Sequence, residues 1–210
     1  MITLSQLKLT REHHPYGLFL PSKAKHLLIG SFPIAKFTNE KLRDTIKQHE
    51  IDFSYGGERS RLWPLLSLSF GITLNTRSRI EAFLKVKGIG IGDVVLSCKR
   101  KNGSSSDDAL REIEYNYALR DKIERYAIDH ILFTSNKVQQ WFEGRIGCAE
   151  HVKRTLLISP SGSGVRGFSK QHQAMYERWA KPRQNSTRSQ FRTYYYMKIF
   201  NDKNFPDIHS

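Results

Sequence analysis

Apolar residues gather in three short runs along the chain, and small polar residues follow each run. The runs are HLLIG at 26–30, HILF at 130–133 and TLLI at 155–158. None of them alternates apolar with polar positions, which is typical of strands that are buried on both faces of a parallel sheet. We therefore predict an α/β fold in which three layers, αβα, enclose a central, mostly parallel sheet of four to five strands.

The segments between these runs have the apolar spacing of helices. We expect helices at 36–50, 60–66, 76–86, 107–125, 138–142 and 171–179. A further strand is expected at 93–98, and the aromatic run TYYYMKIF at 193–200 favours a last edge strand. Gly88, Gly90 and Gly92 form neither a phosphate-binding loop nor a dinucleotide fingerprint, because no helix follows them at the required spacing.

The small polar residues that end the predicted strands should share one edge of the sheet. After the first strand come Gly30, Ser31, Phe32 and Pro33, and Pro33 lacks the amide proton that a further ladder bond needs. Ligands of open α/β sheets bind at the carboxyl ends of the strands, beside helix N-termini. This edge is therefore the expected binding site, with an ordinary tight turn at the end of a core strand as the alternative.

The chain is strongly basic, and its charge is uneven. It has 210 residues with 34 Lys and Arg against 20 Asp and Glu, which gives a formal net charge of +14. Residues 151–210 hold 11 of the basic residues and only 3 of the acidic ones. Such an excess attracts polyanions, of which nucleic acid is the most common in cells. We expect a single domain over 1–210, with a core at 15–180 and a basic C-terminal extension at 181–210.

Cysteine content and hydropathy limit the possible surroundings. Cys98 and Cys148 are too few for a disulfide framework or a four-cysteine metal site. His13 and His14 are read as surface or capping residues, since no further metal ligands accompany them. No apolar run approaches the roughly 20 residues that span a bilayer. We expect a cytoplasmic, monomeric protein without membrane contact, metal or other cofactor.

Four segments in fixed order resemble a known family. They are FLPSKAKHLLIGSFP at 19–33, FSYGGERSRLW at 53–63, GIGIGDVVLSCKRKNGS at 88–104 and SPSGS at 159–163. Together they resemble the uracil-DNA glycosylase superfamily, and most of all its hypoxanthine-DNA glycosylase-like branch with the GSFP motif. The resemblance covers about residues 15–180, and its third segment is the most specific. It implies the uracil-DNA glycosylase-like fold, which is a sheet between helices like the one predicted above.

The resemblance also implies an activity. Members flip a deaminated or damaged base, of the uracil or hypoxanthine type, out of DNA and hydrolyse its N-glycosidic bond. The base must leave the stack because its target atoms are buried in the duplex, at a cost on the order of a few kcal/mol. The expected protein is thus a monofunctional DNA glycosylase, a DNA-binding hydrolase of base excision repair that acts on damaged or mismatched DNA.

The matched segments supply the candidate residues. The candidates for catalysis are Asp93, Ser60 and Glu58, and Asp93 stands where relatives read the base edge. The base-binding pocket is expected from Gly30, Ser31, Phe32, Pro33, Phe53, Tyr55 and Asp93, in which an aromatic ring would stack on the base. The expected DNA contacts are Lys99, Arg100, Lys101, Ser159, Pro160, Ser161, Gly162, Ser163 and Arg166.

Three positions depart from the family pattern. Phe32 stands where Asp or Asn is usual, Ser159 where His or Asn is usual, and Ser60 where the nearest branch has Asn. Asp93 could instead cap backbone amides, and Glu58 could be a solvated loop charge. The alternatives to a glycosylase are a catalytically inactive nucleic-acid-binding protein of the same fold, and a hydrolase or transferase for a small phosphorylated or nucleoside substrate.

Overall fold

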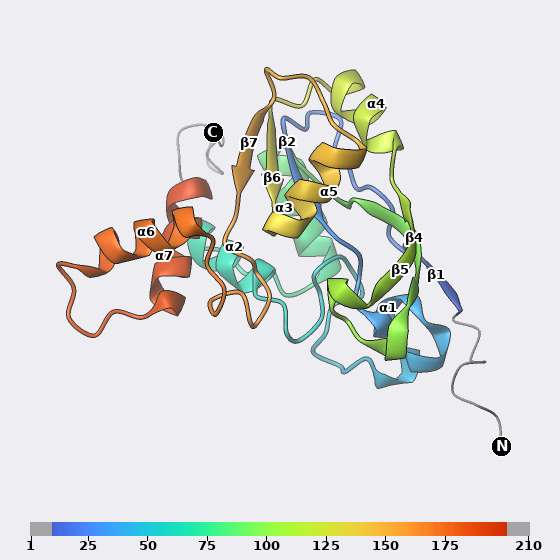
Figure 1. The fold of residues 1–210 in the computed structure, drawn as a ribbon, viewed down its shortest axis with the longest axis horizontal. Coiled ribbons are helices and arrows are strands. Elements are labelled where there is room, and N and C mark those ends of the chain that lie inside the picture. Colours follow the sequence, from blue (N-terminus) through green and yellow to red (C-terminus); the bar gives the residue numbers. More distant parts are fainter. Residues whose placement is uncertain (1–9, 201–210) are drawn as a thin grey trace.

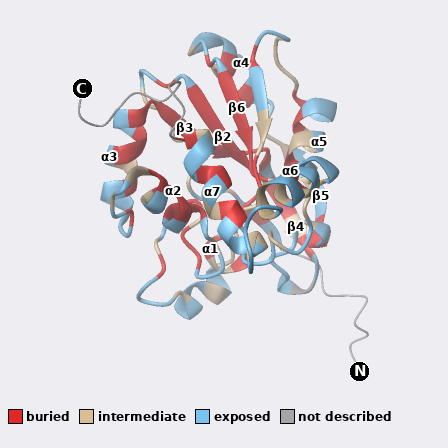
Figure 2. Ribbon diagram, turned by 90° about the vertical axis from the view of Figure 1, so that its left-hand side faces the viewer, coloured by how far each residue is buried: buried red, intermediate tan, exposed pale blue. Residues whose placement is uncertain are grey.

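The structure is a computed structural model that describes residues 10–200, and it contains the predicted parallel sheet (Figure 1). The strands lie in the order β3 (Ile89–Asp93), β2 (His26–Gly30), β6 (His130–Phe133) and β7 (Lys153–Leu156). Every neighbouring pair is parallel. All residues of β2, β3 and β6 are buried, as expected for strands covered on both faces (Figure 2).

Alternate residues of the central strand face two separate cores, so the fold is the predicted three-layer sandwich. Leu28 packs with α2 (Leu62–Phe70), α3 (Arg77–Lys87) and α7 (Arg188–Phe200) on one face. Leu27 and Ile29 pack on the other face, where the helices are α4 (Ala118–Arg125) and α5 (Asn136–Arg145). The predicted helix at 36–50 is reduced to α1 (Ala35–Thr38) and the 3₁₀ helix η2 (Glu40–Thr45).

A second, antiparallel sheet lies beside the first in the order β1 (Arg11–His13), β4 (Val95–Arg100) and β5 (Leu110–Tyr115). Short 3₁₀ helices η3 (Lys101–Gly103) and η4 (Asp107–Ala109) connect β4 with β5. The prediction of one helix over 107–125 is therefore wrong, since β5 separates the 3₁₀ turn η4 from the α-helix α4. Arg111 of β5 lies opposite Lys99 of β4, and the Lys99 side chain also binds Glu112 at 2.8 Å. The backbone groups of β5 therefore bond with β4 and not with a next helical turn of their own segment.

The glycine run is itself a strand. Residues 89–93 form β3, and the predicted strand at 93–98 corresponds to the end of β3 and to β4. Residues 18–20 run beside β3 at Gly90 and Gly92, and a Cβ at either glycine would crowd a leucine of that segment. Phe19 and Ile91 exchange two backbone hydrogen bonds of 2.8 and 2.9 Å. The N-terminal segment therefore covers the outer edge of β3.

The aromatic run at 193–200 is helical, so the predicted edge strand is wrong. It belongs to α7, which follows α6 (Lys170–Ala180), and its buried rings repeat at helical spacing. Tyr195 and Tyr196 donate hydrogen bonds to the carbonyls of Leu156 and Ile158 at 2.8 and 2.9 Å. Since Leu157 N–H bonds inward to β6, these carbonyls point outward. The side chains of α7 thus occupy the place of a further strand.

The C-terminal part of the predicted extension is described only as far as residue 200, and residues 201–210 lie outside the described residues. The boundary of the core at 180 stays a prediction, although α7 beyond it contributes buried rings to the same core as α2. None of the helices within residues 10–200 is long and apolar enough to cross a membrane.

Removing the Tyr196 hydroxyl should destabilise the fold. We expect Tyr196→Phe to lower the free energy of unfolding by about 1–3 kcal/mol, because the buried Ile158 carbonyl loses its partner. Tyr194 on the same helix is 42% exposed, and Tyr194→Phe is the matched control, with an expected change below about 0.5 kcal/mol. Urea unfolding of both variants measures the difference, and equal effects would contradict this role of the hydrogen bond.

Candidate functional site

The carboxyl ends of three neighbouring strands bring polar groups to one edge of the sheet. β2 ends at Gly30 and is followed by Ser31, β3 ends at Asp93, and Thr134 follows β6. Gly30 and Asp93 are partners in the register of β2 and β3. The edge predicted as a binding site is therefore also the place where buried polar side chains meet.

His14 and Asp93 form a buried hydrogen-bonded pair at this edge. His14 Nε2 lies 2.7 Å from Asp93 Oδ2, and the two side chains are only 3% and 5% exposed. His14 Nδ1 accepts hydrogen bonds from the backbone N–H groups of Tyr16 and Gly17 at 3.2 and 3.0 Å, so this nitrogen has no proton. The ring is thus the neutral tautomer with its proton on Nε2, and it donates to the Asp93 carboxylate.

His14 was expected to be a surface or capping residue, and the structure shows the capping role in a buried position. The ring does cap two backbone amides, but it is buried and binds a carboxylate 79 residues away in the chain. The alternative in which the Asp93 carboxylate caps backbone amides is not what the structure shows, because its hydrogen bond comes from His14.

Tyr55 reaches the same place from the loop between η2 and α2. Its hydroxyl donates to Thr134 Oγ1 at 2.8 Å, and Thr134 in turn donates to the carbonyl of Ile29 at 3.1 Å. A Cβ at position 30 would overlap both the Tyr55 hydroxyl and Asp93 Oδ1, so only glycine fits there. Burial and the charge of Asp93 raise the pKa of Tyr55, which keeps the phenol protonated.

The backbone of Tyr55 is strained. Its φ of +60° lies in the left-handed region, which costs a residue other than glycine about 1–3 kcal/mol and is common at functional sites. The residue as a whole is only half-buried, although its hydroxyl is bound inside. The hydrogen bond to Thr134 fixes the Tyr55 side chain at the edge of the sheet.

A second carboxylate, Asp107 of η4, is half-buried beside Ser31. Burial raises the pKa of Asp107 above its ordinary value, the hydrogen bond with Ser31 and the charge of Lys137 oppose this, and the charge of Asp93 adds to it. A carboxyl group with a raised pKa in a polar cluster is a candidate general base. Asp107 was not among the predicted site residues because a helix over 107–125 was expected to begin with it.

Two of the three predicted pocket rings are packed. Phe53 is 1% exposed and stacks on Trp63 with a centroid distance of 6.2 Å. Phe32 is 9% exposed and lies under the Arg100 guanidinium, 5.5 Å from its carbon. These two residues therefore belong to the packing around the site and have no free face for a base. Tyr55 stays a candidate for stacking.

The other two catalytic candidates differ in their surroundings. Glu58 lies on the surface, where its carboxylate pairs with Lys47 at 2.6 Å, so the structure favours the solvated loop charge over a catalytic role. Ser60 forms an isolated antiparallel bridge with Ser161. The loop of 53–63 therefore contacts the loop of 159–163, two segments that the sequence analysis placed in one site.

The basic residues predicted to contact DNA also differ in their surroundings. The Arg100 side chain is 2% exposed, its Nε donates to Glu12 at 3.0 Å, and its Nη2 donates to the Pro33 carbonyl at 2.8 Å. Its predicted contact with DNA is therefore wrong, and it fixes the turn after β2 instead. Lys99 pairs with a carboxylate of β5, whereas Lys101 is exposed and stays a candidate.

The loop at 159–163 is supported from α7. Arg192 of that helix is 5% exposed, and its Nη1 donates to the carbonyls of Ser159 and Ser161 at 3.1 and 2.8 Å. Pro160 is buried and Ser159 half-buried, so the exposed candidates for DNA contact are Ser161, Gly162, Ser163 and Arg166. No pattern in the sequence indicated Arg192, because its role depends on a helix where a strand was predicted.

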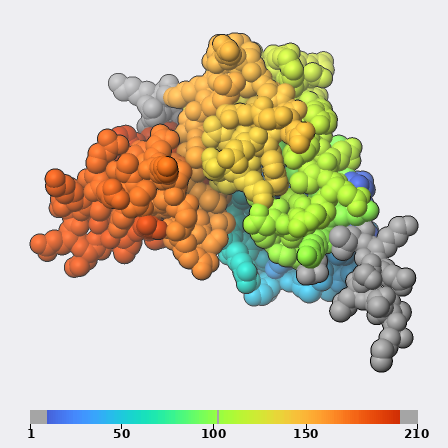
Figure 3. All heavy atoms as spheres, viewed as in Figure 1, coloured from blue at the N-terminus to red at the C-terminus, as the bar shows by residue number. Residues whose placement is uncertain are grey.

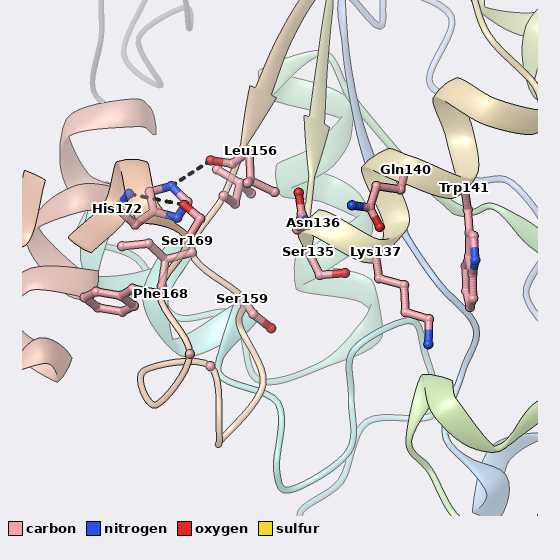
Figure 4. A pocket seen from close by; sticks show the side chains of 14 residues that line it. Ser135, Asn136, Lys137, Gln140, Trp141, Leu156, Ser159, Phe168, Ser169 and His172 are labelled. Atoms are coloured by element: carbon pink, nitrogen blue, oxygen red, sulfur yellow. Dashed lines mark hydrogen bonds between the residues drawn. The ribbon is translucent and has the colours of Figure 1, made fainter. Parts of the chain in front are cut away.

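A groove of about 440 Å³ runs along this edge between α5 and α6 (Figure 4). The N-termini of both helices open onto it, and Ser135 and Ser169 cap them. The ends of these helices carry a partial positive charge, and Lys137 beside them pairs with the Asp108 carboxylate. The residues that line the groove are Ser135, Asn136, Lys137, Gln140, Trp141, Leu156, Leu157, Ile158, Ser159, Gly164, Gly167, Phe168, Ser169 and His172.

Within residues 10–200, no three His, Cys, Asp or Glu side chains gather as a metal site.

A methyl group at position 30 should disturb the cluster. We expect Gly30→Ala to lower the free energy of unfolding by about 1–3 kcal/mol, because Tyr55 and Asp93 must move away from the new Cβ. The control is Gly144→Ala in α5, where a Cβ meets nothing within 4 Å and should be neutral or stabilise by up to about 1 kcal/mol. Chemical denaturation compares the two, and a neutral Gly30→Ala would show that the cluster is not tightly packed.

Comparison with known proteins matches the chain to solved structures alone. No family model and no curated protein matches it. The solution NMR structure of "a putative Uracil DNA glycosylase from Methanosarcina acetivorans" matches with a TM-score of 0.51 and 21% identity. The match covers 80% of this chain and 95% of that chain. At this identity the likeness concerns the fold, and we conclude that the chain has a uracil-DNA glycosylase-like fold.

Proposed function

We propose that this protein is a DNA glycosylase that extrudes a damaged base, of the uracil or hypoxanthine type, and hydrolyses its N-glycosidic bond. The observation that supports this most is the buried Asp93 carboxylate, which His14 orients at the carboxyl edge of a uracil-DNA glycosylase-like sheet. Burying a carboxylate is costly, and a purely structural position is filled more cheaply by an apolar residue. We therefore assign a chemical use to the charge of Asp93, which lies at the edge where the strands end.

The recognition of the base follows from Tyr55 and Asp93. Tyr55 is only half-buried, and we assign its ring as the stacking surface for the base, a contact worth about 1–3 kcal/mol. Asp93 Oδ2 already accepts from His14, so Oδ1 is the oxygen that can accept an N–H of the base edge. A base without an N–H at that point loses about 1–3 kcal/mol of binding.

The hydrolysis needs a base for water and a negative charge near the sugar. The bond between C1′ and the base nitrogen breaks, the base leaves with the electron pair, and the sugar becomes cationic. Water then adds to C1′ and gives a proton to Asp107, while the leaving base takes up a proton. The charge of Asp93 favours the cation in a site from which water is largely excluded. The raised pKa of Asp107 makes it a stronger base than an ordinary carboxylate.

The DNA backbone would lie along the basic C-terminal part. Of the Lys and Arg residues between 138 and 200, none forms an ion pair with another described residue. Helices α6 and α7 project from the body next to the 159–163 loop (Figure 3). Unpaired positive side chains on a projecting surface attract phosphates and release counterions on contact. Among the basic residues predicted to contact DNA, Arg166 and Lys101 are exposed.

The second candidate function is that of a catalytically inactive nucleic-acid-binding protein with this fold. One observation favours it: Phe32, where relatives have a water-positioning Asp or Asn, is packed under Arg100 and offers no polar atom. Both candidates share the fold, the basic surface and the site, and turnover alone separates them.

The proposal is tested with a panel of oligonucleotides that contain one uracil, hypoxanthine, xanthine or alkylated base. We expect alkali-labile sites with at least one of them. Asp93→Asn keeps an oxygen that accepts from His14 but removes the charge, so single-turnover excision should fall about 10- to 100-fold. Glu58→Gln removes a solvated carboxylate and should excise at the wild-type rate. A wild-type protein that binds DNA but cleaves no substrate of the panel would favour the inactive binding protein.

The pH profile of excision tests the role of Asp107. A general base must be ionised, so the rate should fall as the pH drops through the raised pKa of Asp107, above the range of an ordinary Asp. We expect Asp107→Asn to reduce excision about 100-fold or more and to remove this limb of the profile. Asp44→Asn changes an exposed carboxylate of η2 and should keep both rate and profile. An unchanged profile in Asp107→Asn would exclude Asp107 as the base.

A further inference from the structure

A second pocket lies at the opposite edge of the parallel sheet, where all four strands begin. His26 starts β2, His130 starts β6, Lys153 starts β7, and Gly88 precedes β3. The pocket has a volume of about 420 Å³ and is lined by Lys23, Lys25, His26, Lys85, Val86, Lys87, Gly88, Asp129, His130 and Lys153. A strand of five residues is roughly 17 Å long, so this pocket is separate from the site around Asp93.

The walls of this pocket are strongly positive. Five of its ten lining residues are lysines, and Asp129 is the single acidic one. Asp129 lies 3.6 Å from Lys25. Lys23, Lys85 and Lys153 are exposed, and their side chains form no ion pair with another described residue. Lys36, Lys47 and Lys99, in contrast, each pair with a carboxylate. Lys23, Lys85 and Lys153 therefore bring to the pocket positive charge that no other described residue pairs with.

The floor of the pocket holds two buried imidazoles. The rings of His26 and His130 meet edge to face with a centroid distance of 5.7 Å, and His130 Nε2 lies 2.8 Å from Thr155 Oγ1. Burial lowers the pKa of His130 to about 4, and the charges of Lys153 and His26 contribute. His130 is thus uncharged near neutral pH, and the positive charge of the site comes from the lysines around it.

This arrangement selects a ligand by charge. Lysine ammonium groups bind phosphate oxygens as point charges from several directions. None of the lining residues is Phe, Tyr or Trp, so the pocket has no large aromatic face on which a base could stack. Several lysines around one hollow of this size suit a compact anion with more than one phosphate group.

We propose that this pocket binds a compact oligophosphate anion, independently of the glycosylase site. The probe is inorganic tripolyphosphate, titrated calorimetrically into the full-length protein at constant ionic strength. Wild-type protein should bind one equivalent, more tightly than it binds orthophosphate. Lys85→Gln/Lys153→Gln removes two of the unpaired ammonium groups and should weaken binding about 10- to 100-fold.

The matched control removes the same charge elsewhere. Lys181→Gln/Arg183→Gln changes two exposed basic residues between α6 and α7 and should bind tripolyphosphate within about twofold of wild type. Equal losses in both double variants, or no binding by wild type, would overturn the proposal. Undamaged duplex DNA that displaces the probe from wild type at equimolar concentration would show instead that the pocket is a nucleic-acid contact. Thermal unfolding of each variant confirms that it is folded, and excision is not a readout, so failure of the glycosylase proposal leaves this test intact.

Discussion

A carboxylate in the interior of a protein needs a donor, and for Asp93 that donor comes from the first 20 residues. His14 binds Asp93 at the end of β3, and Glu12, two residues earlier, binds Arg100, which holds the Pro33 carbonyl after β2. The N-terminal segment thus fixes the ends of the two strands that form the proposed site. Since the same segment also pairs with Ile91 through Phe19, its position determines the shape of the whole carboxyl edge.

The sequence was sufficient for those parts of the fold that depend on local pattern. Unalternated apolar runs predicted β2 and β6, because a strand covered on both faces has no polar side. The run at 155–158 overlaps only the last two residues of β7, a strand whose residues are exposed or half-buried. The small polar residues after each run predicted the edge where Gly30, Asp93 and Thr134 meet, since parallel strands end together. The segment match to a known family supplied candidate residues in the loops of Ser60 and Ser161, whereas β3 was not predicted as a strand.

The remaining features depend on partners that are distant in the chain. An isolated aromatic run such as TYYYMKIF suits a strand or a helix, and the packing of α7 against α2 decides between them. The residues of β5 have helical spacing but pair with β4. His14 and Asp107 were missed because nothing near them in sequence shows that one meets Asp93 and the other Ser31. Local pattern therefore gave the scaffold, while the chemistry of the site rests on long-range contacts.

The hydrogen bonds from α7 to β7 have a consequence for synthesis of the chain. β7 is an edge strand, and its outward carbonyl at Leu156 binds Tyr195 of α7 and His172 of α6, while the carbonyl of Ile158 just beyond it binds Tyr196 of α7. Domains begin to fold from the N-terminus during translation. Until residues 188–200 have left the ribosome, this edge is open to pairing with a strand of another nascent chain. The last helix thus ends the period in which the protein is prone to aggregation.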